Sequence, residues 1–182
     1  MIDEAFNKKL KRVVLDHVPG CSDLISADRL SGGASQETYR LRVATAEGEK
    51  TLAMRRAPGG EFVERVPQHP GLDVEALLMQ SAAAAGVPEP EVYYVLGKDD
   101  ELGDGFIMEW IDGEALGARI VRSPDYEDIR GRLAYECGRI LAQIHSIDLD
   151  TSGLREKLWE IPPAEFLEQT WERYRLLETP QP

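Results

Sequence analysis

The sequence predicts an α+β fold, in which a five-stranded antiparallel sheet with one helix packed on it is followed by further helices. Two observations lead to this prediction. Five short segments have the residue pattern of strands, and they are joined by short links typical of hairpins. Only one helical segment interrupts the strands, so the regular strand–helix–strand alternation of a parallel sheet is missing.

The composition is that of an ordinary globular protein and argues against several classes. The chain has 182 residues, of which 42 % are hydrophobic and 30 % charged, with a formal net charge of −12. This length suits one domain or slightly more, with a core that needs no disulfides. The negative charge disfavours nucleic-acid binding, and no apolar run approaches the roughly 18 residues of a membrane span. Because the N-terminus is polar and the two cysteines, Cys21 and Cys137, lie far apart in sequence, we expect a reduced, cytoplasmic protein.

The N-terminal part is expected to form a helix and then three strands. Residues 3–18 are predicted to be helical because apolar side chains recur there at helical spacing, and Pro19-Gly20 ends the helix. The three strands are expected at residues 24–30, 38–44 and 50–56. A short polar turn joins the second and third strands, which predicts a hairpin.

A turn-rich stretch separates the third strand from the next helix. Residues 57–72 are expected to form a loop, and loops of this length are often functional. Asp73 is predicted to cap the N-terminus of a helix over residues 74–85, which Gly86 ends. Two more strands, joined by a hairpin loop, are expected at residues 91–97 and 105–110.

The rest of the chain is expected to be helical. A long helix is predicted over residues 125–147, where apolar side chains form one stripe at Leu133, Cys137, Ile140, Leu141 and Ile144. Pro162-Pro163 opens a last helix that carries apolar side chains at Phe166, Leu167, Trp171, Tyr174 and Leu177.

A glycine-rich loop between the first two predicted strands is a candidate phosphate site. It consists of Ser31, Gly32, Gly33, Ala34 and Ser35. Small residues let the backbone approach a ligand, and successive N–H groups can then form a concave nest for phosphate oxygens. The alternative interpretation is a flexible hairpin turn, since glycine pairs are common in turns.

Two charged residues could serve the same ligand. Alternation along the third strand puts Arg55 on the opposite face from Met54 and Arg56, where it could reach a phosphate; the alternative is a solvated arginine on an edge strand. Glu75 lies early in the following helix, where the helix dipole favours a carboxylate in any case. Its functional interpretation is a partner that orients Arg55.

The fourth candidate is the apolar strand that runs into an acidic turn over residues 106–113. A crossing from strand to linker can offer main-chain N–H and C=O groups to a planar base. The alternative is a buried strand with an ordinary exit turn.

The four candidates occur in the order of a protein-kinase-like small lobe. The segments "LSGGASQETYRL", "DVEALLMQSAAAAGVPEPEVYYV", "FIMEWIDGEAL" and "GRILAQIHSIDL" resemble the aminoglycoside phosphotransferase family. The Arg55-Arg56 pair followed by Pro58 resembles the branch of that family related to the kinase-like domain of acyl-CoA dehydrogenase fusion proteins. The resemblance covers roughly residues 23–177.

The resemblance implies a role for each candidate residue. The glycine-rich loop would cover the phosphates of ATP, and Arg55 stands where the family usually has the phosphate-binding lysine. Arginine keeps the charge but presents a planar fork of donors, so this is not a conservative exchange. Glu75 would pair with Arg55. The backbone groups that would meet adenine belong to Glu109 and Ile111, with Trp110 between them.

The residues that would carry phosphoryl transfer itself are missing. The family uses an H-G-D-x-x-x-x-N loop and a later acidic metal ligand, and none of the histidines His17, His69 and His145 begins such a motif. Asp148 and Asp150 could suggest a metal pair, but a helix exit with solvated acids is the favoured interpretation. We therefore assign no catalytic residue and no metal ligand, and expect Mg²⁺ only with the missing C-terminal part.

These features predict a nucleotide-binding lobe over residues 1–110, a linker over 111–122 and the start of a helical lobe over 123–182, truncated before the catalytic loop. The expected function is the ATP-binding portion of a small-molecule phosphotransferase, which transfers the γ-phosphate to a hydroxyl acceptor and is inactive as this chain alone. Apolar faces left exposed on the last two helices favour self-association. The alternatives are a non-catalytic nucleotide-binding or protein-interaction module, and a fragment of a protein kinase.

Overall fold

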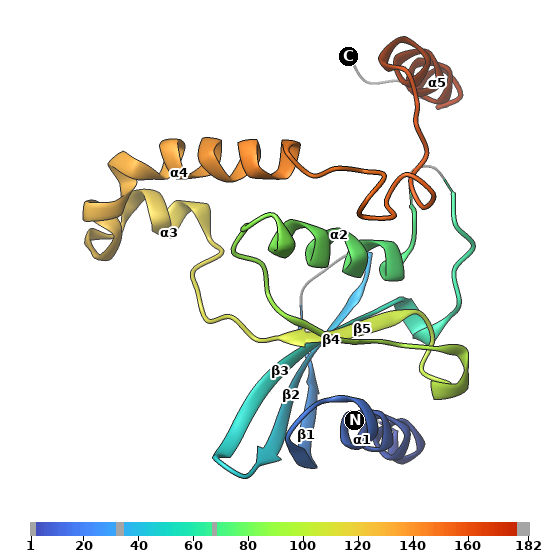
Figure 1. Ribbon diagram of the computed structural model, residues 1–182, viewed down its shortest axis with the longest axis vertical. Helices are drawn as coiled ribbons and strands as arrows, with labels where there is room; N and C mark the ends of the chain where they lie inside the picture. The colour runs from blue at the N-terminus through green and yellow to red at the C-terminus, as the bar shows by residue number, and fades with distance from the viewer. Residues whose placement is uncertain (1–2, 32–34, 67–68, 178–182) are drawn as a thin grey trace.

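The computed structural model describes residues 3–31, 35–66 and 69–177, and its architecture is α+β (Figure 1). Gly32, Gly33 and Ala34 of the glycine-rich loop lie outside the described residues. The strands are β1 (Cys21–Arg29), β2 (Glu37–Thr45), β3 (Gly48–Arg56), β4 (Val92–Val95) and β5 (Gly105–Glu109). They form one antiparallel sheet in the order β1-β2-β3-β5-β4, which confirms the predicted sheet and the resemblance to a kinase-like small lobe.

The sheet carries a helix on each face, so the prediction of a single packed helix is wrong. Helix α1 (Glu4–His17) packs its buried side chains against the face that carries Leu41 and Met54. Helix α2 (Leu72–Ala84) covers the other face, where Phe106 is fully buried. Figure 1 shows the two helices on opposite sides of the sheet. Because successive strand residues point to opposite faces, each strand supplies side chains to both cores.

Helix α2 begins at Leu72, and Asp73 is not its N-cap. Gly71 takes the position before the helix with a φ of +104°, which favours glycine. Leu72 is buried in the same cluster as Phe106, so this contact draws the first turn onto the sheet. The Asp73 carboxylate forms an ion pair with Arg65 instead of capping the helix.

The segment between β3 and α2 is partly structured. It contains a short 3₁₀ helix, η1 (Pro58–Gly60), which packs tightly against the turn before β5. A Cβ atom on Gly103 would lie 2.2 Å from the carbonyl of Gly60, so only glycine permits this contact. Asp104 accepts a hydrogen bond of 2.7 Å from the Val63 N–H. These contacts hold residues 57–63 beside the end of β3.

Two predicted boundaries shift because of tertiary contacts. Strand β1 begins at Cys21 rather than Leu24, since Cys21 pairs with Thr45 at the far end of β2. The predicted helix over residues 125–147 begins with a 3₁₀ turn, η3 (Pro124–Tyr126), and its α-helical part is α4 (Glu127–His145).

The C-terminal part consists of helices with little buried surface. Helix α3 (Gly117–Arg122) lies within the predicted linker, and α5 (Pro163–Arg175) follows α4. Gln143 of α4 donates a hydrogen bond of 3.2 Å to the Gly86 carbonyl, just after α2. Most of the exposed large hydrophobic side chains of the described chain lie in residues 111–177. In the part that the structure describes, no helix has the length and apolar character needed to cross a membrane.

Candidate functional site

The centre of the candidate site is an ion pair between Arg55 at the end of β3 and Glu75 in the first turn of α2. Strand alternation places Arg55 on the α2 face, where its guanidinium Nη1 donates to Glu75 Oε1. The two side chains are 35 % and 30 % exposed, so both remain accessible to a ligand. Gln36 Nε2 donates to the other oxygen of Glu75 at 3.3 Å. Glu75 therefore links β3 to the residue that follows the glycine-rich loop.

A cavity of about 560 Å³ lies beside this ion pair. Volumes of about 300–1,000 Å³ are typical of small-molecule sites. The end of the glycine-rich loop, the start of α2 and the segment after β3 line it, with Ser35, Gln36, Ala57, Pro58, Val63, His69, Pro70, Gly71, Leu72, Glu75, Leu78 and Asp104. Its wall is thus largely apolar, with charged and amide groups at the side of the loop.

The glycine-rich loop is described only at its two ends. Ser31 and Ser35 are both exposed, while Gly32, Gly33 and Ala34 fall in the part left undescribed. The Leu30 N–H donates to the Thr38 carbonyl at 2.8 Å and closes the hairpin at the base of the loop. The two ends of the loop therefore lie at the same end of the strands as Arg55, whose partner on β2 is Thr38.

The linker residues lie at the other end of the β3–β5 ladder. The Glu109 N–H donates to the Glu91 carbonyl at 2.8 Å, so this donor is used inside the fold. Trp110 Nε1 donates to Asp112 at 2.8 Å. Ile111 is 55 % exposed, and its N–H makes no hydrogen bond to any residue that the structure describes. Within the described residues, the backbone N–H groups of Trp110 and Ile111 therefore have no hydrogen-bond partner, while that of Glu109 has one.

One small side chain, Ala53, lies on the α2 face between the linker and the ion pair, a feature that the sequence analysis missed. Glu109 pairs with Leu52 and Phe106 with Arg55, so the two ends lie about 10 Å apart along the strands. Ala53 points to the same face as Arg55 and is buried. An alanine two residues before a candidate arginine is the signal that could have revealed this small side chain.

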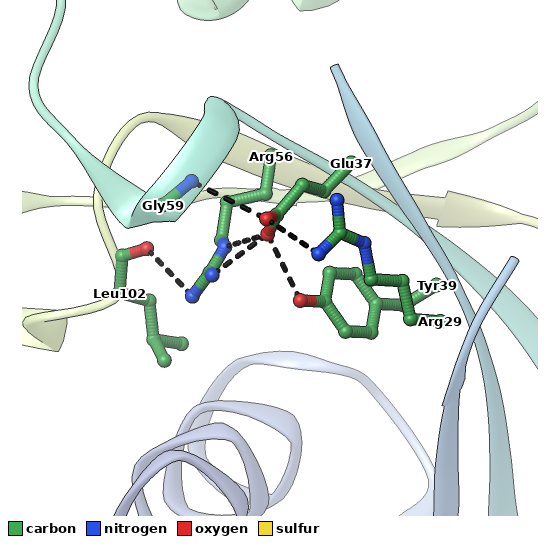
Figure 2. A network of polar contacts seen from close by, with 6 residues as sticks. All are labelled: Arg29, Glu37, Tyr39, Arg56, Gly59 and Leu102. Atoms are coloured by element: carbon green, nitrogen blue, oxygen red, sulfur yellow. Dashed lines mark hydrogen bonds and ion pairs between the residues drawn. The ribbon is translucent and has the colours of Figure 1, made fainter. Parts of the chain in front are cut away.

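A second charged cluster, also missed, lies around the Glu37 carboxylate (Figure 2). Glu37 accepts hydrogen bonds from Arg56 Nε at 3.0 Å and Nη2 at 2.7 Å, and from the Tyr39 hydroxyl at 2.9 Å. The Gly59 N–H donates to its other oxygen at 3.3 Å, and Arg29 Nη1 lies 3.1 Å from that same oxygen. The alternating buried pattern of β2 puts Glu37 on the core side, and a buried acid requires such partners.

The Glu37 cluster predicts a specific dependence of stability on pH. Burial by itself raises the pKa of the Glu37 carboxyl, but hydrogen bonds from Arg56, Tyr39 and Gly59 hold that pKa below its ordinary value. A lowered pKa stabilises the fold above the unfolded-state value of about 4.3, and this contribution is lost as the pH falls through the folded-state pKa. We therefore expect Glu37→Gln to unfold more easily than wild type at pH 7, with a difference that shrinks below about pH 4.

Urea unfolding of both proteins across this range measures the difference in the free energy of unfolding. Other carboxyl groups with lowered pKa values, including Asp23 and Asp148, remain in both proteins and cancel in the comparison. A difference that stays constant down to about pH 3 would show that the Glu37 carboxylate contributes no pH-dependent stability.

The remaining acidic and histidine candidates have structural surroundings. Asp148 accepts hydrogen bonds from the N–H groups of Asp150 and Thr151 at 2.8 and 3.0 Å, and Asp150 forms an ion pair with Arg155. His145 is exposed at the end of α4. Within the described ranges, no group of three or more His, Cys, Asp or Glu side chains comes together as a metal site.

The arrangement of loop, cation, acid-bearing helix and linker agrees with a comparison of the chain with protein families. Residues 26–181 match the phosphotransferase enzyme family (APH), a region that begins inside β1 and includes Arg55, Glu75 and the linker. No curated protein matches the chain. Since the match covers most of the 182 residues, the chain belongs to the phosphotransferase enzyme family, and its fold is that of a kinase-type transferase.

Proposed function

We propose that this chain binds ATP on the α2 face of the sheet and is the nucleotide-binding portion of a kinase that phosphorylates a hydroxyl group of a small molecule. The observation that carries the proposal is the Arg55–Glu75 ion pair beside the glycine-rich loop and the cavity. Glu75 holds one side of the guanidinium and leaves about a third of the Arg55 side chain exposed. A phosphate can therefore approach Arg55 without breaking the pair.

The chemistry of the donors fits a nucleotide. When bound, ATP supplies the phosphoryl group that a complete enzyme of this family transfers. Phosphoryl transfer depends mainly on positioning and on charges aimed at the phosphate oxygens. In our proposal Arg55 supplies the charge, the N–H groups and serines of the glycine-rich loop surround the phosphates, and the Ile111 N–H meets the base.

The finer predictions remain part of the proposal. The lobe boundaries at residues 110 and 122, the kinship with acyl-CoA dehydrogenase fusion proteins, the cytoplasmic location and the hydroxyl acceptor stay predictions. Self-association through the last helices is supported by exposed apolar side chains such as Leu141 and Trp171. Inactivity of the chain alone is supported by the absence of an H-G-D-x-x-x-x-N motif from its sequence.

A titration of the 182-residue chain with ATP at low salt tests the proposal. We expect saturable binding that is weaker for adenosine than for ATP, because most of the proposed contacts go to the phosphates. Incubation with ATP and simple alcohols should release no ADP above the buffer control. Absence of saturable binding at millimolar ATP would overturn the nucleotide site, and hydroxyl phosphorylation would overturn the inactivity.

A non-catalytic nucleotide-binding or interaction module is the second candidate. The exposed apolar faces of α4 and α5 favour it, since these helices bury no residue completely. Such a module would also bind ATP, so the ATP titration does not separate it from the kinase proposal. The two proposals differ in whether phosphoryl transfer appears when a C-terminal segment is added. If an added C-terminal segment with the missing motif restores phosphoryl transfer, the kinase proposal stands and the module is excluded.

A further inference from the structure

The Glu37 cluster lies on the opposite face of the sheet from Arg55, yet it joins β1, β2, β3 and η1, which border the proposed phosphate site together with the start of α2. Arg29 is close to the end of β1 that enters the glycine-rich loop, and Glu37 starts the strand that leaves it. Gly59 belongs to η1, next to Pro58 in the cavity wall. Arg56 follows Arg55 directly in β3. One carboxylate thus bonds to four backbone or side-chain partners, which lie on β1, β2, β3 and η1.

The cluster is held rigidly. Glu37 is 6 % exposed and the Arg56 side chain 11 % exposed. The Arg56 guanidinium lies 4.7 Å from the ring of Phe6 in α1 and 5.6 Å from the ring of Tyr39, within the range of cation–π attraction. A Cβ atom on Gly60 would lie 2.9 Å from Arg56 Nη1, so η1 closes over the same group. Charge-assisted hydrogen bonds in such surroundings are strong and directional.

The geometry of Arg55 and Arg56 makes the two faces of the sheet interdependent. Adjacent strand residues point to opposite faces of the sheet. Glu37 therefore holds β3 through Arg56 on the α1 face, and Glu75 holds it through Arg55 on the α2 face. Glu37 is the first residue of β2, and Gln36 precedes it directly in the chain. The Gln36 side chain donates a hydrogen bond to Glu75. The two ion pairs therefore share β3, and Gln36 links the residue before β2 to Glu75.

We propose that Glu37 is a positioning residue of the nucleotide site, because its carboxylate ties both ends of the glycine-rich loop to η1 and to β3 and so sets the loop and Arg55 in place for the phosphates. This inference rests on the proposed ATP binding. Glu37 does not itself touch the nucleotide. Its loss acts through the fraction of molecules in which Arg55 and the adjoining ends of β1 and β2 are held for binding, and the apparent dissociation constant rises as that fraction falls.

The test compares Glu37→Gln with Asp100→Asn, a control with similar chemistry. Asp100 is also 6 % exposed and accepts hydrogen bonds from a tyrosine hydroxyl, Tyr94, at 3.0 Å and from a glycine N–H, Gly97, at 2.7 Å. It belongs to the 3₁₀ helix η2 (Lys98–Asp100), between β4 and β5 and away from the glycine-rich loop. Dissociation constants for ATP and for adenosine are measured far below the unfolding temperature, together with amide hydrogen exchange at Leu30 and Gly59.

We expect Glu37→Gln to weaken ATP binding about tenfold, the effect of a binding-competent arrangement of Arg55 and the adjoining ends of β1 and β2 that is populated about one tenth of the time. Adenosine binding should be unchanged, since the linker that meets the base does not depend on Glu37. Exchange at Leu30 and Gly59 should be faster in this variant, and Asp100→Asn should show none of these changes. Equal losses for ATP and adenosine, or equal effects of both variants, overturn the inference, because a general loss of stability would produce them.

Failure of the proposed function is distinguishable from failure of this inference. If the wild type binds no ATP, the exchange rates alone decide whether Glu37 holds the loop: faster exchange in Glu37→Gln than in Asp100→Asn supports it, and equal rates overturn it. If Glu37→Gln does not fold, Arg29→Gln replaces it. The Arg29 side chain is 58 % exposed, so its removal spares the core while freeing the β1 end of the loop. A threefold or smaller loss of ATP affinity with faster Leu30 exchange is then expected, and unchanged exchange overturns the inference.

Discussion

Arg55→Ala is expected to weaken ATP binding by about 10- to 100-fold. Hydrogen bonds to a charged group contribute about 1.5–3 kcal/mol, and each 1.4 kcal/mol corresponds to about a tenfold change in the dissociation constant. Arg55 is the cation that the fold presents beside the glycine-rich loop and the cavity. The partly exposed Glu75 left behind remains hydrated, so the free energy of unfolding should change little. Titration calorimetry with ATP measures the affinity.

Arg65→Ala is the matched control for Arg55→Ala. Arg65 also forms an ion pair with an acid in the first turn of α2, Asp73, and the two side chains are 43 % and 41 % exposed. Loss of this pair should leave the ATP affinity within about twofold, as expected for an exposed ion pair. Arg55→Lys should bind ATP better than Arg55→Ala because it keeps the charge and loses only the fork of donors. Equal affinities for wild type and Arg55→Ala would remove Arg55 from the site.

Phe106→Ala is expected to lower the free energy of unfolding by about 3–5 kcal/mol, the range for removing a fully buried aromatic side chain. Phe106 has no exposed surface and pairs directly with Arg55 across the β3–β5 ladder. Its ring belongs to the core cluster with Ala57, Leu72 and Ala76, which fixes α2 on the sheet. Those neighbours are mostly small, so they can fill little of the cavity that the substitution leaves. Urea unfolding measures the change.

The control for Phe106→Ala is the same substitution on the exposed helix α5. Phe166 is 53 % exposed, so Phe166→Ala should change the free energy of unfolding by no more than about 0.5 kcal/mol. A comparable loss from both variants would mean that Phe166 is buried in solution, for instance by self-association. In that case the unfolding midpoint should also depend on protein concentration.

The periodicity of the sequence was sufficient to predict the sheet and the face of β3 on which Arg55 lies. Clean alternation in β2, with buried Tyr39, Leu41 and Val43 between exposed arginines, was sufficient to place that strand and its buried face. The same periodicity separated Arg55 from Arg56, whereas the pairing of Glu75 with Arg55 was predicted from the resemblance to the family. These features depend on residues close in sequence, where strand and helix periods dictate which side chains share a face.

The partners that meet across the sheet could be identified only from the three-dimensional structure. Glu37, Arg29 and Arg56 belong to three strands, and their convergence depends on the strand register and on η1 closing over Arg56. The packing of α1 on the second face, and the burial of Leu72 that moves the start of α2 away from Asp73, are likewise long-range contacts. Periodicity along one chain segment shows which side chains are buried, but it carries no information about the distant residues that bury them.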